Sequence, residues 1–469
     1  MRILVLGGSA AGLFTSLLLA RAGHDVVVLE RDDISPAPDV ETAAVRAFRA
    51  AAPQIVQPHI VLALCRVLLR RHLPDVYEAL VEAGAREAGL ETQMAPTLAD
   101  RSSRQGDERF TSLMTRRSTL DQVLRLTAAE QAGLQIRSGV RVLGLAGVSG
   151  AVPRVTGAHT GVGDFSADLV IDATGRRSQI DRWVTDLGGR ASATVWAECG
   201  VAYYTRHYRL TTSDGLPGPR TTRIVAGLDE FTVGIWAGDN DTMVLGLAPL
   251  AEDKRFRRLA DPVAFTALLR TVPVYAGWLE VLEPISGVYP MAGLHNTYRE
   301  LVDDDGPIAV GLWGIGDVIC TTNPTLGRGL SLALGGAANL LAALDEYDGE
   351  ALVRILHERN GEDIAPYYAD QALIDATRLA MVRHNVFGSP APPPPPDDRV
   401  TYGQLRNAAA FDPTAFRAFW KVMGMITRPD EVYTDPEVIR CTREVLVRHG
   451  AAPPIAQPSH ADIETALGG

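Results

Sequence analysis

The first thirty residues place the strongest constraint on the fold of this chain. An apolar run at 3–6 leads into a glycine-rich turn, an apolar helical stretch and a second apolar run that ends at Glu30. Gly7 and Gly12 fit the pattern G-x-G-x-x-G, with Ser9 in the place of the middle glycine. Gly7 permits the tight turn, Ser9 is small enough for the backbone to approach a pyrophosphate, and Gly12 lets helix and strand pack closely. The order of strand, turn, helix, strand and acid predicts a Rossmann-like unit that binds an adenine dinucleotide.

The same unit indicates which of its atoms would contact the dinucleotide. The free N–H groups at the helix start, around Ser9, Ala10 and Ala11, would face the phosphates. Glu30 lies 18 residues after Gly12, where a carboxylate accepts hydrogen bonds from ribose hydroxyls, and Arg31 follows it.

A secretory signal is the competing interpretation of this segment, because Ala20-Arg21-Ala22 resembles a cleavage site. Three glycines interrupt the apolar stretch, only one arginine precedes it, and cleavage would remove the phosphate loop. No uninterrupted apolar run reaches the roughly 18 residues needed to span a bilayer. We therefore expect a cytoplasmic protein without a membrane span.

Composition excludes several other classes. A chain of 469 residues should hold more than one domain, and its net charge of −11 disfavours nucleic acid as a partner. The four cysteines are far apart and form no C-x-x-C pair, so we expect neither a disulfide scaffold nor a metal site.

Two later segments extend the nucleotide-binding pattern. Residues 168–178 form a buried strand that runs into Asp172-Ala-Thr-Gly175. Residues 307–317 form another buried strand that ends in Gly316-Asp317, and 323–330 continue as Asn-Pro-Thr-Leu-Gly-Arg-Gly-Leu.

With these three motifs in this order, the chain resembles the FAD-dependent monooxygenases of the p-hydroxybenzoate hydroxylase fold over roughly residues 1–345. The resemblance implies an α/β fold, with a Rossmann-like FAD-binding domain at 1–182 that is completed by a return segment at 285–345. An inserted β-sheet substrate domain would occupy 183–284. A C-terminal helical region would occupy 346–469, with a proline-rich loop at 390–396.

The resemblance also implies roles for individual residues. Asp317 would bind the ribityl chain, Gly327 and Gly329 would allow close approach to the isoalloxazine edge, and the helix beginning near Leu330 would direct its amides at flavin N1 and O2. Arg117 would contact FAD, and Val142 matches a strand that contacts adenine. The complete set of expected cofactor contacts is Gly7, Ser9, Ala10, Ala11, Gly12, Glu30, Arg31, Arg117, Val142, Asp172, Gly175, Gly316, Asp317, Pro324, Gly327, Arg328, Gly329 and Leu330.

The fold hosts several chemistries, so particular residues must discriminate among them. Halogenases of the family need a tunnel lysine and usually a W-x-W-x-I-P segment, whereas the two lysines here, Lys254 and Lys421, are not suitably placed and no W-x-W occurs. The Asp-Ala-Thr-Gly motif replaces the usual Asp-Gly pair. This departure favours NAD(P)H acting as ultimate donor through a separate flavin reductase.

Short segments of the sequence resemble segments of bacterial secondary-metabolite enzymes, including polyether-type epoxidases of antibiotic biosynthesis. These segments are Gln57-Pro-His59, 203–209 and Thr322-Asn-Pro324. The resemblance predicts epoxidation or hydroxylation of a hydrophobic alkene or aromatic natural-product precursor by molecular oxygen, through a flavin C4a-hydroperoxide. The alternative is a flavin-dependent reductase or dehydrogenase of a prenyl or polyketide-like substrate.

Candidates for a catalytic role are His59, Tyr203, Arg206 and Tyr208. By strand alternation, Tyr203 shares one face with Thr205 and His207, while Arg206 and Tyr208 share the other.

Overall fold

The computed structural model describes residues 1–49, 52–450 and 455–468. Its nucleotide-binding part is built on a five-stranded sheet in the order β19-β9-β1-β2-β5, with every neighbouring pair parallel. The central strand, β1, is apolar because both faces of a parallel sheet are covered. The strands are β1 (Arg2–Leu6), β2 (Asp25–Glu30), β5 (Leu134–Ser138), β9 (Leu169–Asp172) and β19 (Leu312–Gly314).

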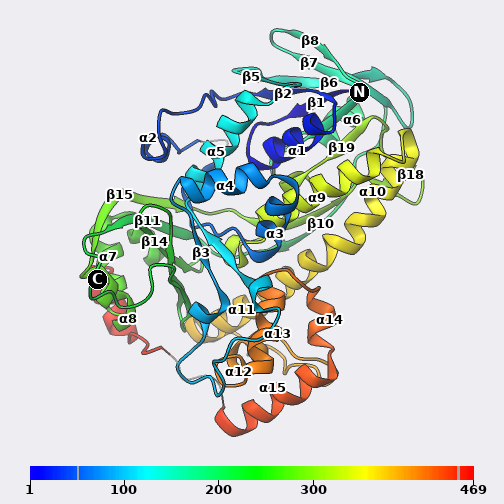
Figure 1. The fold of residues 1–469 in the computed structure, drawn as a ribbon. Helices are drawn as coiled ribbons and strands as arrows, with labels where there is room; N and C mark the ends of the chain where they lie inside the picture. Colours follow the sequence, from blue (N-terminus) through cyan, green and yellow to red (C-terminus); the bar gives the residue numbers. More distant parts are fainter. Residues whose placement is uncertain (50–51, 451–454, 469) are drawn as a thin grey trace.

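Helices and a small antiparallel sheet cover this parallel sheet, as Figure 1 shows. Helix α1 packs against both α9 and α5, so the helices that follow two of the three glycine motifs lie side by side. The helices of this layer are α1 (Ala10–Arg21), α3 (Ala63–His72), α4 (Pro74–Glu82), α5 (Arg117–Glu130), α9 (Gly329–Leu344) and α10 (Gly349–Asp363). Smaller elements are α2 (Val40–Val45), α6 (Ile180–Asp186), β3 (Arg86–Ala88), β4 (Ser112–Met114), β6 (Val142–Val148), β7 (Arg154–Thr160), β8 (Gly163–Ser166), β17 (Val302–Asp303) and β18 (Gly306–Pro307).

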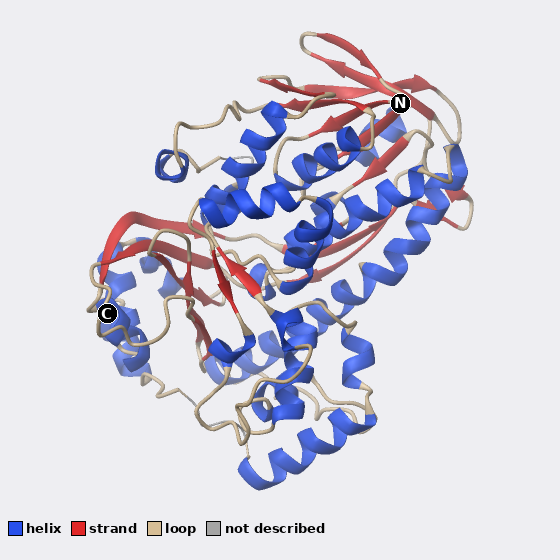
Figure 2. Cartoon of the chain, viewed as in Figure 1, coloured by secondary structure: helices blue, strands red, loops and turns tan. Residues whose placement is uncertain are grey.

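The inserted segment forms a five-stranded antiparallel sheet in the order β12-β13-β14-β11-β15, seen on the left in Figure 2. Its strands are β11 (Tyr203–Leu210), β12 (Arg223–Gly227), β13 (Phe231–Ala237), β14 (Thr242–Pro249) and β15 (Leu282–Met291), and the helices α7 (Pro262–Arg270) and α8 (Pro273–Leu279) precede β15. A three-stranded sheet of β10 (Ala193–Glu198), β16 (His295–Glu300) and β20 (Cys320–Thr321) brings the chain back to the nucleotide-binding part.

The chain after α10 is helical. Helix α11 (Ala365–Phe387) runs beneath β10 and β16, and the last helices gather below it in Figure 1. These are α12 (Tyr402–Ala408), α13 (Pro413–Met423), α14 (Pro429–Tyr433) and α15 (Pro436–His449), whereas α16 (His460–Ala466) packs against α7 of the inserted segment. Within the described ranges, no helix combines the length and the apolar character needed to cross a membrane.

The expected α/β class is confirmed, and the elements refine the expected segments. Strand β15 belongs to the inserted sheet and runs on to Met291, beyond the expected end of that segment at 284. The proline run 392–396 lies outside helices and strands, as its missing N–H donors require.

Candidate functional site

The glycine turn between β1 and α1 is dictated by close packing. Gly7 has φ +105°, and a Cβ built on it would lie 2.6 Å from the carbonyl oxygen of Ala173. A Cβ on Gly12 would lie 1.9 Å from the carbonyl oxygen of Gly7. Any larger residue at either position would push the turn away from the strand, so these two glycines fix the position of the first turn of α1.

Two long helices present uncapped N-termini. No side chain caps α1 at Ser9 or α9 at Arg328, and neither helix has an acid in its first turn. The Arg328 side chain points elsewhere, since it is buried, pairs with Asp370 and donates to the carbonyl oxygen of Tyr367 at 2.9 Å. A Cβ on Gly329 would meet nothing within 4 Å. The free amides and the open space at Gly329 fit an anionic ligand that extends from one helix end to the other.

Glu30 supports the phosphate loop from the end of β2. Its buried carboxylate accepts hydrogen bonds from the N–H groups of Gly8 at 2.8 Å and Asp32 at 3.0 Å, and it pairs with Arg49 at 3.1 Å. The side chain therefore shapes the loop itself, and any ribose hydroxyl would share its remaining acceptor sites. Arg31 is exposed beside it.

Three further charged side chains approach the same region. Arg117, the first residue of α5, binds Asp121 at 2.6 Å. The Asp317 carboxylate has no hydrogen-bond or ion-pair partner among the described residues. Burial raises its pKa, and the positive charges of Arg117 and Arg176 lower it by a smaller amount. Arg176 likewise lacks a partner within the described chain, and burial lowers its pKa. Unpartnered charges of both signs are what a ribityl and pyrophosphate group would satisfy, so these residues fit FAD.

The other expected cofactor residues lie where their motifs place them. The buried Asp172 accepts from the backbone and hydroxyl of Thr174 at 2.9 and 2.6 Å, so its carboxylate orders its own loop. Val142 begins β6, and Gly316 and Gly175 have positive φ at turns.

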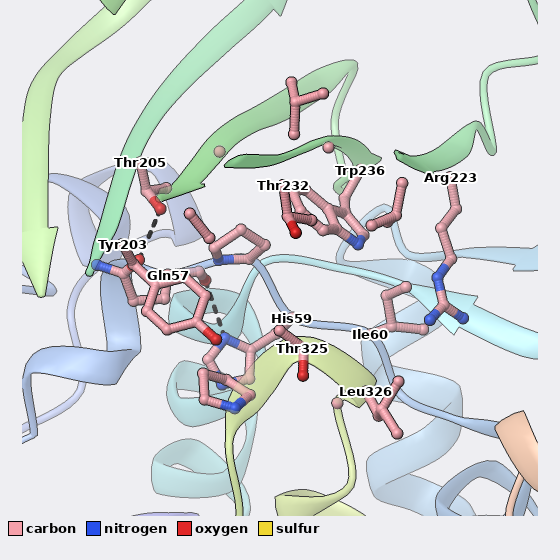
Figure 3. Close-up of a pocket in the computed structure, with 18 of the residues that line it drawn as sticks. Gln57, His59, Ile60, Tyr203, Thr205, Arg223, Thr232, Trp236, Thr325 and Leu326 are labelled. Carbon is pink, nitrogen blue, oxygen red and sulfur yellow. Dashed lines mark hydrogen bonds between the residues drawn. The ribbon is translucent and has the colours of Figure 1, made fainter. Parts of the chain in front are cut away.

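A pocket opens between the inserted sheet and the loop that precedes α9 (Figure 3). It encloses about 660 Å³, counting its open mouth. Its floor is Pro324–Gly327 and its roof comes from β11–β14. Among the described residues that line it there is no aspartate, glutamate or lysine. The lining residues are Gln57, Pro58, His59, Ile60, Leu62, Tyr203, Thr205, Arg223, Val225, Thr232, Val233, Gly234, Trp236, Gly246, Leu247, Ala248, Met291, Pro324, Thr325, Leu326 and Gly327.

His59 connects this pocket to the region of Arg117. Its Nδ1 lies 2.9 Å from the carbonyl oxygen of Gln57 and its Nε2 lies 3.4 Å from Arg117 Nη1. A carbonyl can only accept and a guanidinium can only donate, so the proton sits on Nδ1. Burial, with the charge of Arg117 adding to it, lowers the pKa of His59 to about 4, and the ring is neutral at physiological pH.

Tyr203 is held by a buried polar network that reaches the C-terminal helices. Its hydroxyl donates to Asn323 Oδ1, and the Asn323 amide donates at 2.8 Å to Asp375 on α11. Asp375 is fully buried and also accepts from Asn296 at 2.8 Å and Arg378 at 3.1 Å. Burial raises the pKa of the Tyr203 hydroxyl well above its usual value, so Tyr203 is a neutral donor.

Arg206 and Tyr208, two of the expected catalytic residues, do not line this pocket. Arg206 donates to the carbonyl oxygen of Ser286 at 3.0 Å and to Thr266 at 3.3 Å, and its guanidinium lies 5.5 Å from the centre of the Tyr208 ring. Both project from the sheet face opposite Tyr203 and Thr205, toward α7, because β11 alternates.

Several residues of the site were missed from sequence. Thr205 shares the face of Tyr203 and could have been found by alternation. Trp236 and Arg223 are opposed on neighbouring strands and enter the pocket only through the fold of the sheet. Asp375 lies in a long helix with no motif around it, so nothing local marked it.

Comparison with known proteins supports the same architecture. No family model matches the chain. It is 25% identical to Protein Rv3254 of Mycobacterium tuberculosis, over 92% of this chain and 91% of that protein. The flavin-dependent brominase Bmp2 aligns with a TM-score of 0.64 at 16% identity, covering 96% of this chain and 100% of its own. PqsL, a probable FAD-dependent monooxygenase from Pseudomonas aeruginosa, aligns with a TM-score of 0.56 at 15% identity, covering 82% of this chain and 96% of its own. The chain thus has the p-hydroxybenzoate hydroxylase-like fold that FAD-dependent monooxygenases and halogenases share.

Proposed function

We propose that this protein binds FAD and inserts one atom of dioxygen into an alkene or aromatic carbon of an apolar precursor. The observation that carries the proposal is the junction of the two sites. The pocket floor at Pro324–Gly327 directly precedes the uncapped N-terminus of α9, where the space above Gly329 is open.

The residues that would hold FAD are distributed along its length. The N-terminus of α1, with Arg117, would bind the pyrophosphate; Asp317 would bind the ribityl hydroxyls, and the N-terminus of α9 would favour negative charge on the pyrimidine end. Reduced FAD, when bound, supplies the activation of dioxygen. The chain contributes binding, orientation and exclusion of water.

The pocket wall favours a substrate that needs no general base. Both nitrogens of His59 are engaged, and Tyr203 directs its proton to Asn323. A phenol profits from a proton acceptor, whereas an alkene needs none. The absence of acids from the described lining therefore supports epoxidation ahead of phenol hydroxylation.

Electron supply forms a second part of the proposal. The Asp172 carboxylate is satisfied within its own loop, and the motif departs from the usual Asp-Gly pair. We infer that NAD(P)H reduces the flavin through a separate reductase.

The test is turnover under labelled dioxygen. Full-length protein loaded with FAD, a flavin reductase and NADH would be incubated under ¹⁸O₂ with a panel of polyketide and terpenoid alkenes and aromatics, with and without bromide. A product carrying one ¹⁸O atom is expected. A product without label that has gained two hydrogen atoms would show that the enzyme is a reductase. A brominated product that forms only with bromide would show that it is a halogenase.

A further inference from the structure

One charged side chain in the pocket has no hydrogen-bond or ion-pair partner among the described residues. Arg223, the first residue of β12, lines the pocket at the end away from Tyr203 (Figure 3). The side chain as a whole is half-buried, its Nη1 atom is buried and makes no hydrogen bond, and no acid among the described residues forms an ion pair with the guanidinium. Partial removal of a cation from water without a counter-charge is unfavourable, because the lost hydration is not fully replaced.

The surroundings of Arg223 compensate its charge only in part. Its guanidinium lies 5.7 Å from the ring centre of Trp420 on α13, a cation–π contact that stabilises the cation. Arg406, on α12, donates at 2.7 Å to the carbonyl oxygen of Val225 two residues along the same strand. Burial, with Arg406 adding to it and Tyr402 opposing it, lowers the pKa of Arg223 to about 10, so the group is still protonated at neutral pH.

The neighbours of this arginine along the pocket are apolar. Ile60 and Leu326 lie between it and the His59 region in Figure 3, and Trp236 forms part of the roof. An occupant that satisfies Arg223 must place an anionic group at this end and an uncharged body over the floor loop. Bidentate pairing with a carboxylate matches the geometry of a guanidinium.

We propose that the pocket takes an amphipathic acid, whose carboxylate pairs with Arg223 and whose apolar body carries the carbon that is oxidised. This inference rests on the proposed function for the chemistry of the oxidised carbon. The recognition of the acid stands on Arg223 alone, so the two can fail separately.

The test measures binding without turnover. Full-length protein is titrated, by calorimetry and by tryptophan fluorescence, with paired probes: 2-naphthoate, cinnamate and indole-3-acetate, each against its own primary amide. The acids are expected to bind about tenfold or more tightly than their amides, as a charge-assisted hydrogen bond predicts. R223Q should abolish that preference, leave amide binding unchanged and leave FAD binding unchanged.

The matched control is R270Q, which removes the same charge from an exposed arginine on α7 of the same inserted segment. It should bind every probe as the wild type does. R223K serves if R223Q does not fold, and it should retain a weaker preference for acids. The proposal is overturned if no acid binds the wild type more tightly than its amide, or if the preference survives in R223Q. Loss of FAD binding in the wild type would instead refute the proposed function and leave the acid preference as measured.

Discussion

The buried carboxylate of Asp375 should be one of the most destabilising positions to truncate in this protein. It accepts hydrogen bonds from Asn296, Asn323 and Arg378, and it is fully buried. D375A would remove an acceptor from the side-chain amides of Asn296, Asn323 and Gln371 and the ion-pair partner from Arg378. Breaking a buried ion pair by removing one partner costs about 3–5 kcal/mol, so we expect a loss of that size. Urea unfolding followed by circular dichroism measures it directly, as a lower midpoint.

The control for this prediction is D363A. Asp363 lies at the exposed end of α10 and accepts a single hydrogen bond, from Asn339 at 2.8 Å. Its loss should change the free energy of unfolding by about 0.5 kcal/mol or less. The reasoning is refuted if D375A and D363A have the same midpoint, because the network would then contribute no more than one surface contact.

Four other outcomes are expected. D317A should retain the fold and weaken FAD binding about tenfold, measured by flavin fluorescence titration, because the Asp317 carboxylate has no partner in the described protein. His59 takes up a proton near pH 6.5 in the unfolded chain and only near pH 4 in the folded chain. Its contribution to the free energy of unfolding should therefore fall by about 1.4 kcal/mol per pH unit as the pH drops from 6.5 to 4. H59Q should reduce that slope in urea midpoints measured from pH 7 to 4, and an unchanged slope would contradict the assignment. G329V should lose FAD or release hydrogen peroxide in place of product, because its side chain would occupy the open space before α9; a fully coupled variant would count against that placement. Stopped-flow reduction of the flavin by NADH alone should be slow, and reduction as fast as turnover would refute the separate reductase.

Much of the nucleotide-binding part could be predicted because its constraints are local. Gly12 is required by a contact with Gly7 within the turn itself, so sequence spacing alone identifies it, whereas Gly7 also contacts Ala173, 166 residues later in the chain. Similarly, Pro436 in the first turn and His449 in the last turn are residue types that favour these positions, and they delimit α15.

The pocket could be predicted only in part because its members meet through long-range packing. Alternation correctly separated Tyr203 and Thr205 from Arg206, but both faces of β11 carry a mixture of polar and aromatic residues, so the pattern does not tell which faces the floor loop. Arg223 and Trp420 are nearly 200 residues apart in sequence, and only the folded C-terminal helices bring them together.

The polar groups around the pocket fall into two kinds, those whose hydrogen-bond donors are satisfied by the protein and Arg223, whose guanidinium is not. Thr205 donates to Gln57 Oε1 at 2.6 Å, His59 donates to the Gln57 carbonyl, and Tyr203 donates to Asn323, so these donors are already satisfied by the protein. A wall of satisfied donors holds its shape without binding a polar substrate group, and it leaves the reacting carbon in apolar surroundings that exclude water. Arg223 differs from these three residues, since its buried Nη1 atom makes no hydrogen bond and no acid among the described residues pairs with its charge. The pocket therefore separates orientation, which we assign to the arginine end, from reaction, which we assign to the floor beside α9.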